Sequence, residues 1–145
     1  MRGLAILAVV ALAAMPSGAR AASAEGEWVT EGDKARVAIA PCAGNAAQLC
    51  GTITWSYRPA DAPPGELRDI NNTDAKLRDR PIVGLPLLQG FSPDGQDAWS
   101  GGTIYDPEGG KTYKSKLKLD GADTLKVDGC VLFLCQTQTW TRFRG

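Results

Sequence analysis

The stretch DINNTDAKLRDRP, residues 69–81, contains a dense group of potential metal ligands. Carboxylate and amide oxygens, such as those of Asp69, Asn71 and Asp74, are ligands that Ca²⁺ prefers in proteins. The spacing does not match an EF-hand loop, because no glycine stands at the sixth position and Arg80 stands where the closing glutamate is needed. The sequence therefore predicts no metal site in this stretch.

A structural role explains the basic residues of the same stretch better. Arg78 and Arg80 are close enough in sequence to form ion pairs with two aspartates. These are Asp69 and Asp79, and we expect the pairs to lock the loop against the rim of the fold. The segment DAKLRD further predicts one helical turn with Thr73 as its N-cap. We interpret the stretch as a connection, with contact to a bound ligand as the alternative.

Two other patterns suggest chemistry that the rest of the sequence does not support. WSGGTIYDPEGGKTY, residues 99–113, has the glycines and the lysine of a phosphate loop, but such a loop leads into a helix, and here a strand pattern follows. We therefore predict a hairpin turn over residues 106–110. The chain has no histidine, which excludes Ser/His/Asp and Cys/His catalytic groups. Carboxylate pairs remain open, but the acids are scattered among turns. We predict no enzymatic activity, no catalytic residues and no cofactor.

The chain contains four cysteines, an even number, and all of them lie after the first 24 residues. They are Cys42, Cys50, Cys130 and Cys135. Four cysteines allow three pairings, and proximity in sequence favours Cys42 with Cys50 and Cys130 with Cys135. A metal site is the alternative, but the chain lacks both C-x-x-C pairs and histidine. We expect two disulfides, which form in oxidising compartments.

Residues 1–24 have the pattern of a secretory signal peptide: an early arginine, an apolar run over residues 4–15 and then small residues. The run is too short for a membrane-spanning helix, which needs ~20 apolar residues. Cleavage after Ala24 fits the small-x-small rule, and cleavage after Ala21 fits it nearly as well. We expect residues 25–145 to form one exported domain without a transmembrane segment.

Removal of the leader changes the net charge of the chain, because the leader contains two arginines and no acidic residue. The full chain has 16 basic and 16 acidic residues, and two arginines, Arg2 and Arg20, lie in the leader. The exported chain is then slightly acidic. Attraction to a phosphate backbone needs a clustered basic surface, so we expect no nucleic-acid partner.

Alternating patterns predict β-strands along the exported chain. RVAIAP places Val37 and Ile39 on one face, and GTITWSY places Ile53, Trp55 and Tyr57 on one face. KTYKSKLKLD alternates apolar side chains with lysines, TLKVDG repeats the pattern, and CQTQTWTRF supplies a last strand. Turn sequences with Asp-Gly or Gly-Gly separate the strands. About eight antiparallel strands in so few residues are most simply closed into a barrel, with a flattened sandwich as the alternative.

Two motifs at the ends of this chain resemble those of calycin barrels, the lipocalin-like group. GEW contains Trp28, and TWTR contains Arg142. The resemblance implies a structural pair in which the Trp28 ring packs across the closed end of the barrel. The Arg142 guanidinium then lies over the ring and donates to carbonyls of the neighbouring turn.

The exported chain as a whole resembles the secreted bacterial family known as domain of unknown function 2147. The segments that carry the resemblance span nearly all of residues 26–142: GEW, VAIAPCAGNAAQLCGTITW, DINNTDAKLRDRPIVGLPLL, WSGGTIYDPEGGKTYKSKLKL, LKVDGC and CQTQTWTR. The resemblance implies an all-β, calycin-like or lipocalin-like barrel in the bacterial envelope, periplasmic or secreted. It implies no established activity.

A barrel of this size is wide enough for one small ligand or is filled by its own side chains. Aromatic side chains with polar tips suit an amphipathic ligand. We predict binding of a small apolar or amphipathic molecule by Trp55, Trp99, Tyr105, Tyr113 and Arg80. The alternative is an envelope protein-binding module or inhibitor that acts through residues 59–81 and the apolar residues 131–134, because exposed apolar residues are costly without a partner.

Overall fold

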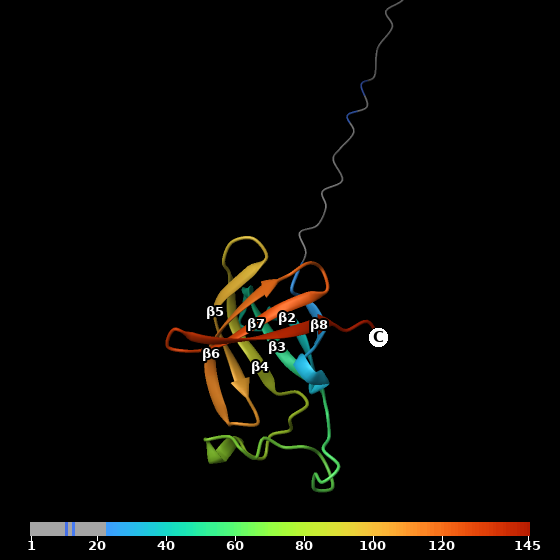
Figure 1. Ribbon diagram of the computed structural model, residues 1–145, viewed down its shortest axis with the longest axis vertical. Coiled ribbons are helices and arrows are strands. Elements are labelled where there is room, and N and C mark those ends of the chain that lie inside the picture. Colours follow the sequence, from blue (N-terminus) through green and yellow to red (C-terminus); the bar gives the residue numbers. More distant parts are fainter. Residues whose placement is uncertain (1–10, 12, 14–22) are drawn as a thin grey trace, which may run out of the picture.

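A computed structural model describes residues 11, 13 and 23–145 (Figure 1). Eight strands follow one another in chain order and close into an antiparallel barrel in which each strand pairs with its neighbours and β1 pairs with β8. The elements are β1 (Gly26–Val29), η1 (Glu31–Asp33), β2 (Ala35–Cys42), β3 (Asn45–Ser56), η2 (Ala75–Leu77), β4 (Pro86–Pro93), β5 (Ala98–Asp106), β6 (Lys111–Leu119), β7 (Thr124–Val131) and β8 (Leu134–Arg142). The predicted barrel is confirmed.

The alternation of side chains along the strands separates the core from the surface. On β6, Ser115, Leu117 and Leu119 are buried, while the lysines between them are exposed. The paired β7 residues Leu125 and Val127 are buried on the same side. Burial of such side chains removes apolar surface from water, which drives closure of the sheet.

A bulge in β3 changes the direction of one predicted core residue. Arg36 pairs with Trp55, but the next residue, Val37, pairs with Ile53, so Thr54 has no partner on β2. The extra residue moves everything after it to the opposite face of the sheet. Trp55 therefore does not share the inward face of Ile53: it is 40% exposed, and the Arg36 guanidinium lies 5.1 Å from its ring centroid.

The connections divide the barrel into two different ends (Figure 1). The chain segments before β1 and after β8 lie at one end, together with the turns that follow β2, β4 and β6. At the other end are the turns after β1, β5 and β7 and the long segment of residues 57–85, which runs across the lower end of the barrel in Figure 1.

The first of these ends is closed by Trp28 and Arg142. The Trp28 ring is fully buried, and its Nε1 donates a hydrogen bond to the Ala24 carbonyl at 2.8 Å. The Arg142 guanidinium lies 4.3 Å from the ring centroid. Arg142 donates to the carbonyls of Ser23, Glu25 and Ala122 at 2.9–3.0 Å, so one side chain joins the N-terminal segment to the β6–β7 turn.

Gly26 is required at this closed end. Its φ of 121° lies in a region that residues with a side chain rarely adopt, and a Cβ at this position would lie 2.8 Å from Nη1 of Arg142. The glycine of the Gly-x-Trp motif therefore leaves room for the arginine that covers the tryptophan.

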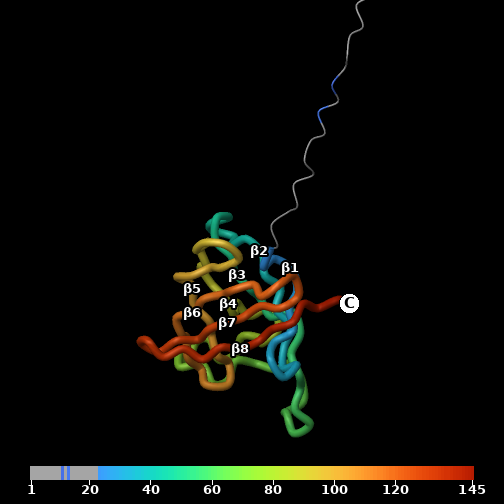
Figure 2. The backbone as a smooth tube through the Cα atoms, turned by 45° about the horizontal axis from the view of Figure 1, so that its top comes forward, coloured from blue at the N-terminus to red at the C-terminus, as the bar shows by residue number. Residues whose placement is uncertain are grey.

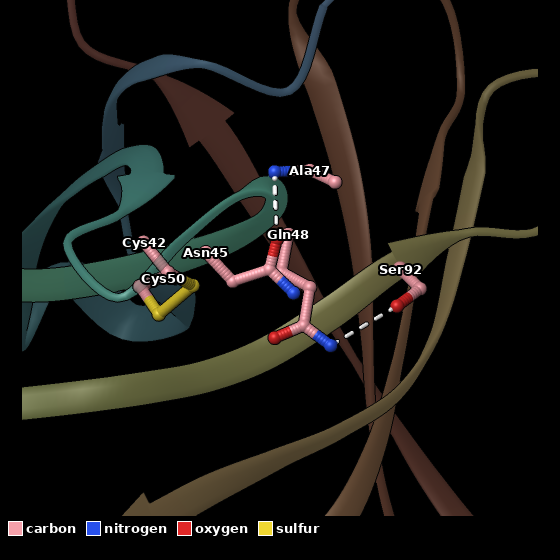
Figure 3. Close-up of a disulfide and its surroundings, with 6 residues drawn as sticks. All are labelled: Cys42, Asn45, Ala47, Gln48, Cys50 and Ser92. Atoms are coloured by element: carbon pink, nitrogen blue, oxygen red, sulfur yellow. Dashed lines mark hydrogen bonds between the residues drawn. A yellow bond between two sulfur atoms is a disulfide. The ribbon is translucent and has the colours of Figure 1, made fainter.

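A disulfide joins Cys42 to Cys50 at the β2–β3 hairpin (Figure 3). Within the hairpin the Asn45 side chain accepts a hydrogen bond from the Ala47 amide at 3.0 Å, and Gln48 donates to the Ser92 hydroxyl of β4 at 3.2 Å. The second disulfide joins Cys130 to Cys135. Both pairings are those that proximity in sequence favours.

The predicted signal peptide falls mostly on residues 1–10, 12 and 14–22, which lie outside the described residues. Among the residues that the structure does describe, no helix is long and apolar enough to cross a membrane.

A candidate ligand-binding calyx

A cavity of about 1090 Å³ extends from the interior of the barrel to the loops of the second end, where it opens to solvent. We call this cavity the calyx and its opening the mouth. Its walls come from strands β3 to β8, and its mouth is bordered by the β1–β2 and β5–β6 turns and by the segment of residues 57–85. Small-molecule sites in proteins commonly have volumes of about 300–1,000 Å³, so the calyx has room for one small ligand.

The wall of the calyx is mainly apolar, with a few polar groups. Apolar side chains of four different strands contribute to it, namely Ile53, Leu87, Ile104 and Val127, and further apolar residues lie nearer the mouth. Gly129 of β7 also faces the cavity, and a Cβ there would make only ordinary contacts, 3.7 Å from Ile104 and 4.0 Å from Tyr113. The absence of a side chain at this position enlarges the cavity.

Strand β8 contributes the polar side of the wall. Gln136, Gln138 and Trp140 all line the calyx. The Trp140 indole is buried, and its Nε1 donates a hydrogen bond to Oε1 of Gln138 at 2.9 Å. The two glutamines face inward but remain exposed, because the cavity is open to solvent at the mouth.

The predicted ligand-binding residues occupy four different environments. Tyr105 and Tyr113 both line the calyx. Trp99 packs against the edge of the core and pairs with Leu117, but it lines neither the calyx nor the groove described below. Trp55 lies outside the barrel because of the β3 bulge. Arg80 lies in the segment that crosses the mouth, where an aspartate holds it.

Asp69 connects that segment to the barrel. Its carboxylate is completely buried and accepts three hydrogen bonds: from the Tyr105 hydroxyl at 2.6 Å, from Asn72 Nδ2 at 2.8 Å and from Arg80 Nε at 2.8 Å. The Arg80 guanidinium also lies 5.1 Å from the centroid of the Tyr105 ring. Asp69 thus joins two parts of the segment, residues 69–72 and Arg80, to Tyr105 of β5.

The network changes the pKa values of its two acidic groups. Burial by itself raises the pKa of Asp69, but hydrogen bonds from Asn72, Tyr105 and Arg80 and the charge of Arg80 outweigh it and leave the pKa below the ordinary aspartate value of 3.8. Burial and the neighbouring Asp69 carboxylate raise the pKa of Tyr105 to about 12. Around neutral pH, Asp69 is therefore ionised and Tyr105 keeps its proton, as the hydrogen bond between them requires.

The remaining polar residues of the segment differ in part from the expectation. Arg78 donates from Nε to the Asn72 carbonyl at 2.8 Å. The Asp79 carbonyl accepts a hydrogen bond from Arg68. The helical turn is the 3₁₀ helix η2, and the side chain of Asp74, one residue after the predicted Thr73, caps it by accepting from the Lys76 amide at 3.0 Å.

A second cavity, a groove of about 890 Å³, lies beside the mouth. Its basic lining residues are Arg80, Lys111 and Lys114, and none of its lining residues is acidic. Tyr105, Tyr113 and Val131 line both the groove and the calyx, so the two spaces share a wall. We call this second cavity the rim groove.

Several residues that line the calyx were not among the ligand-binding residues predicted from the sequence. Gln136, Gln138 and Trp140 stand on one face of the last predicted strand, and their period-two spacing was the available signal. Ile104 and Gly129 carry no such signal, because an apolar residue or a glycine in a strand has the same appearance whether it faces a filled or an open interior.

Metal ligation finds no support in the part of the chain that the structure describes. No three histidine, cysteine, aspartate or glutamate residues come together there in a group that could hold an ion. The aspartate-rich stretch instead uses Asp69 for Arg80, Asn72 and Tyr105 and uses Asp74 for a helix cap.

A closed eight-stranded antiparallel barrel with one sealed end and one open end defines the class of lipocalin-like barrels. A search of solved structures supports this class: a protein from the human pathogen Helicobacter pylori, described as belonging to the lipocalin family, matches with a TM-score of 0.70 and 20% sequence identity over 83% of this chain and 82% of that chain. The likeness concerns the fold.

The family is established by the sequence match. Residues 26–142 match the model of the family described as "Uncharacterized protein conserved in bacteria (DUF2147)", and the chain belongs to this family. A search of curated proteins gave no match.

Proposed function

We propose that this protein binds one small apolar or amphipathic molecule in the calyx, without catalysis. The observation that carries the proposal is the cavity of about 1090 Å³, which is walled by apolar side chains and open at one end only. The predicted leader and the two disulfides support a site of action outside the cytoplasm, in the periplasm or the surrounding medium.

The distribution of side chains explains why an amphipathic ligand fits. The apolar part of a ligand would lie against Ile53, Ile104 and Val127 and leave water, which stabilises the complex by about 25 cal/mol for each Å² buried. The polar part would lie toward the mouth, where Tyr113 and the glutamines of β8 offer hydrogen bonds. The network around Asp69 holds the segment across the mouth in place, so less order is lost when the ligand enters.

A variant that fills the calyx tests this proposal. We expect Gly129→Leu to place a side chain among Ile104 and Tyr113 and to lower the affinity for a fluorescent fatty acid at least about tenfold, a change of 1.4 kcal/mol in binding free energy. Gly44→Leu is the matched control, because a Cβ at Gly44 meets nothing within 4 Å and Gly44 lies outside the calyx. Native mass spectrometry of protein purified from its own host is the second measurement.

Each of the two measurements has one result that supports the proposal and one that contradicts it. An adduct of a few hundred daltons on the wild-type protein, absent from Gly129→Leu, supports the calyx as the site. A clean apo mass together with no binding of fluorescent fatty acids contradicts the proposal. Equal binding by the wild type and Gly129→Leu would also contradict it, since the ligand would then lie elsewhere.

A further inference from the structure

The hairpin between β7 and β8 ends in four consecutive exposed apolar residues, which we call the apolar tip. Val131 is 57% exposed, Leu132 82%, Phe133 92% and Leu134 78%. Figures 1 and 2 show this hairpin projecting sideways beyond its neighbours, at the end of the orange and red ribbon. A contiguous apolar surface of this kind on a protein that acts in water indicates contact with another apolar phase.

The tip is held in a fixed shape. The disulfide between Cys130 and Cys135 closes its base, and Val131 pairs with Leu134 above the bridge. Leu132 has a φ of 54°, in the left-handed region that disfavours a leucine and that a glycine or asparagine would occupy at lower cost. The hairpin therefore carries a large apolar side chain where folding alone favours a small or polar one.

Basic side chains stand directly behind the tip. Lys114 of β6 pairs with Cys130 at the base of the hairpin. Lys111 and Lys114 line the rim groove together with Val131 and Leu132, and no acidic residue lines it. The apolar tip thus projects beyond the two lysines at its base. This order matches that of a bilayer surface, where the acyl chains lie deeper than the anionic headgroups.

We propose that the apolar tip inserts into the surface of a bilayer that contains anionic lipids, with Lys111 and Lys114 at the headgroups. A bilayer fits the tip better than a protein partner does. A stable protein interface buries about 800 Å² on each partner, whereas the tip is the narrow convex end of two strands. The pairing of Val131 with Leu134 also satisfies part of the backbone hydrogen bonding at the end of the hairpin, which lowers the cost of entering the interface.

Docking would bring the mouth of the calyx to the membrane. Val131 and Leu134 belong both to the tip and to the lining of the calyx, so insertion of the tip places the opening next to the lipid surface. The proposal goes beyond ligand binding and does not rest on it, because docking requires only the exposed tip and the lysines.

Flotation with lipid vesicles tests the proposal on the exported chain. We expect the protein to float with vesicles of phosphatidylcholine and phosphatidylglycerol, and the double variant Leu132→Ser/Phe133→Ser to bind at least about tenfold more weakly. The matched control is Ile70→Ser/Val83→Ser, which changes two apolar residues that are also exposed at the mouth end, 68% and 49%, but outside the tip. The control should float like the wild type. Circular dichroism would show that both variants are folded.

Two further variants probe the geometry. Lys111→Gln/Lys114→Gln should lower binding to the anionic vesicles several-fold, and added salt should weaken wild-type binding in the same direction. Phe133→Trp should gain fluorescence quenching by brominated acyl chains relative to the wild type. Overturning results are the absence of vesicle binding, equal losses in the tip variant and its control, or capture of one protein partner through Leu132 and Phe133 without vesicle binding.

Discussion

A single buried carboxylate, Asp69, determines how the longest connection of the molecule lies on the barrel. Its three hydrogen bonds come from two residues of its own segment and from Tyr105 of β5. A buried charge is stable only when its partners satisfy it, and here the surroundings of Asp69 do so. The loop that the sequence presents as a polar connection is therefore anchored at one point.

Substitution of Asp69 should show this anchoring as pH-dependent stability. We expect Asp69→Asn to lower the free energy of unfolding by about 2–4 kcal/mol at pH 7, because asparagine has no charge for Arg80 and only one acceptor oxygen for the donors of Arg80, Asn72 and Tyr105. The folded-state pKa of Asp69 is below the ordinary aspartate value of 3.8, so the stabilisation by the carboxylate is fully present above that value and is lost as the pH falls through the folded pKa.

Urea denaturation at several pH values checks this prediction. The difference between wild type and Asp69→Asn should shrink as the pH is lowered from 7 to below 3.8. Asp79→Asn, a change of an exposed carboxylate in the same segment, serves as the control and should cost less than about 0.5 kcal/mol. A difference between wild type and Asp69→Asn that stays constant over this range would contradict the ionic role of Asp69.

The segment that precedes β1 behaves as part of the barrel. Ala24 is completely buried, its carbonyl accepts from Trp28 Nε1, and the Ser23 carbonyl accepts from Arg142 Nη2 at 3.0 Å. Removal of these residues would leave the buried indole N–H without its acceptor, at a cost of about 1–3 kcal/mol.

These contacts favour the earlier of the two predicted cleavage sites, because the later one would remove Ser23 and Ala24 from the folded barrel. We expect cleavage after Ala21, which keeps Ser23 and Ala24, rather than after Ala24. The intact mass of the exported protein should correspond to a chain that begins at Ala22. In addition, a recombinant chain that begins at Glu25 should be about 1–3 kcal/mol less stable than one that begins at Ala22. An exported chain that starts at Glu25 would refute the prediction.

The barrel as a whole closes through its shortest pairing. β1 and β8 share two residue pairs, Trp28 with Arg142 and Val29 with Thr141, whereas β7 and β8 share eight. This seam is also the pairing that joins the two ends of the chain, so its formation closes the largest loop. The Arg142 side chain reinforces the seam through its contacts with Trp28 and with carbonyls on both sides.

Replacement of Arg142 should therefore weaken the pairing of β1 with β8 more than the other strand pairings. We expect Arg142→Ala to lower the free energy of unfolding by about 2–4 kcal/mol and Arg142→Lys by about 1–2 kcal/mol, since lysine keeps the charge but not the planar fork. Hydrogen exchange in the variant should rise first at β1 and β8. Arg144→Ala, which changes an exposed arginine near the same end, is the control and should have little effect. Loss of the same stability on both substitutions would contradict the clamp.

The sequence by itself was enough for the strands, because alternation along a strand is a local property, and about eight strands in so short a chain favoured their closure into a barrel. The alternation of lysines on β6 and of Leu125 and Val127 on β7 indicated which face of each strand is buried, although the partner strands were not known. The Gly-x-Trp motif in the same way indicated the start of the barrel. The cysteines likewise lay close enough in sequence for their pairing to be inferred.

The tertiary structure decided what depends on pairing between distant segments. The outward position of Trp55 follows from a bulge opposite β2, which the alternation within β3 does not contain. The calyx likewise depends on several strands at once. The space beside Gly129 of β7 is part of the cavity because Ile104 of β5 and Tyr113 of β6 form the wall around it. Side-chain direction is set within a strand, whereas register and empty volume are set between strands, and for that reason only the folded chain shows the site.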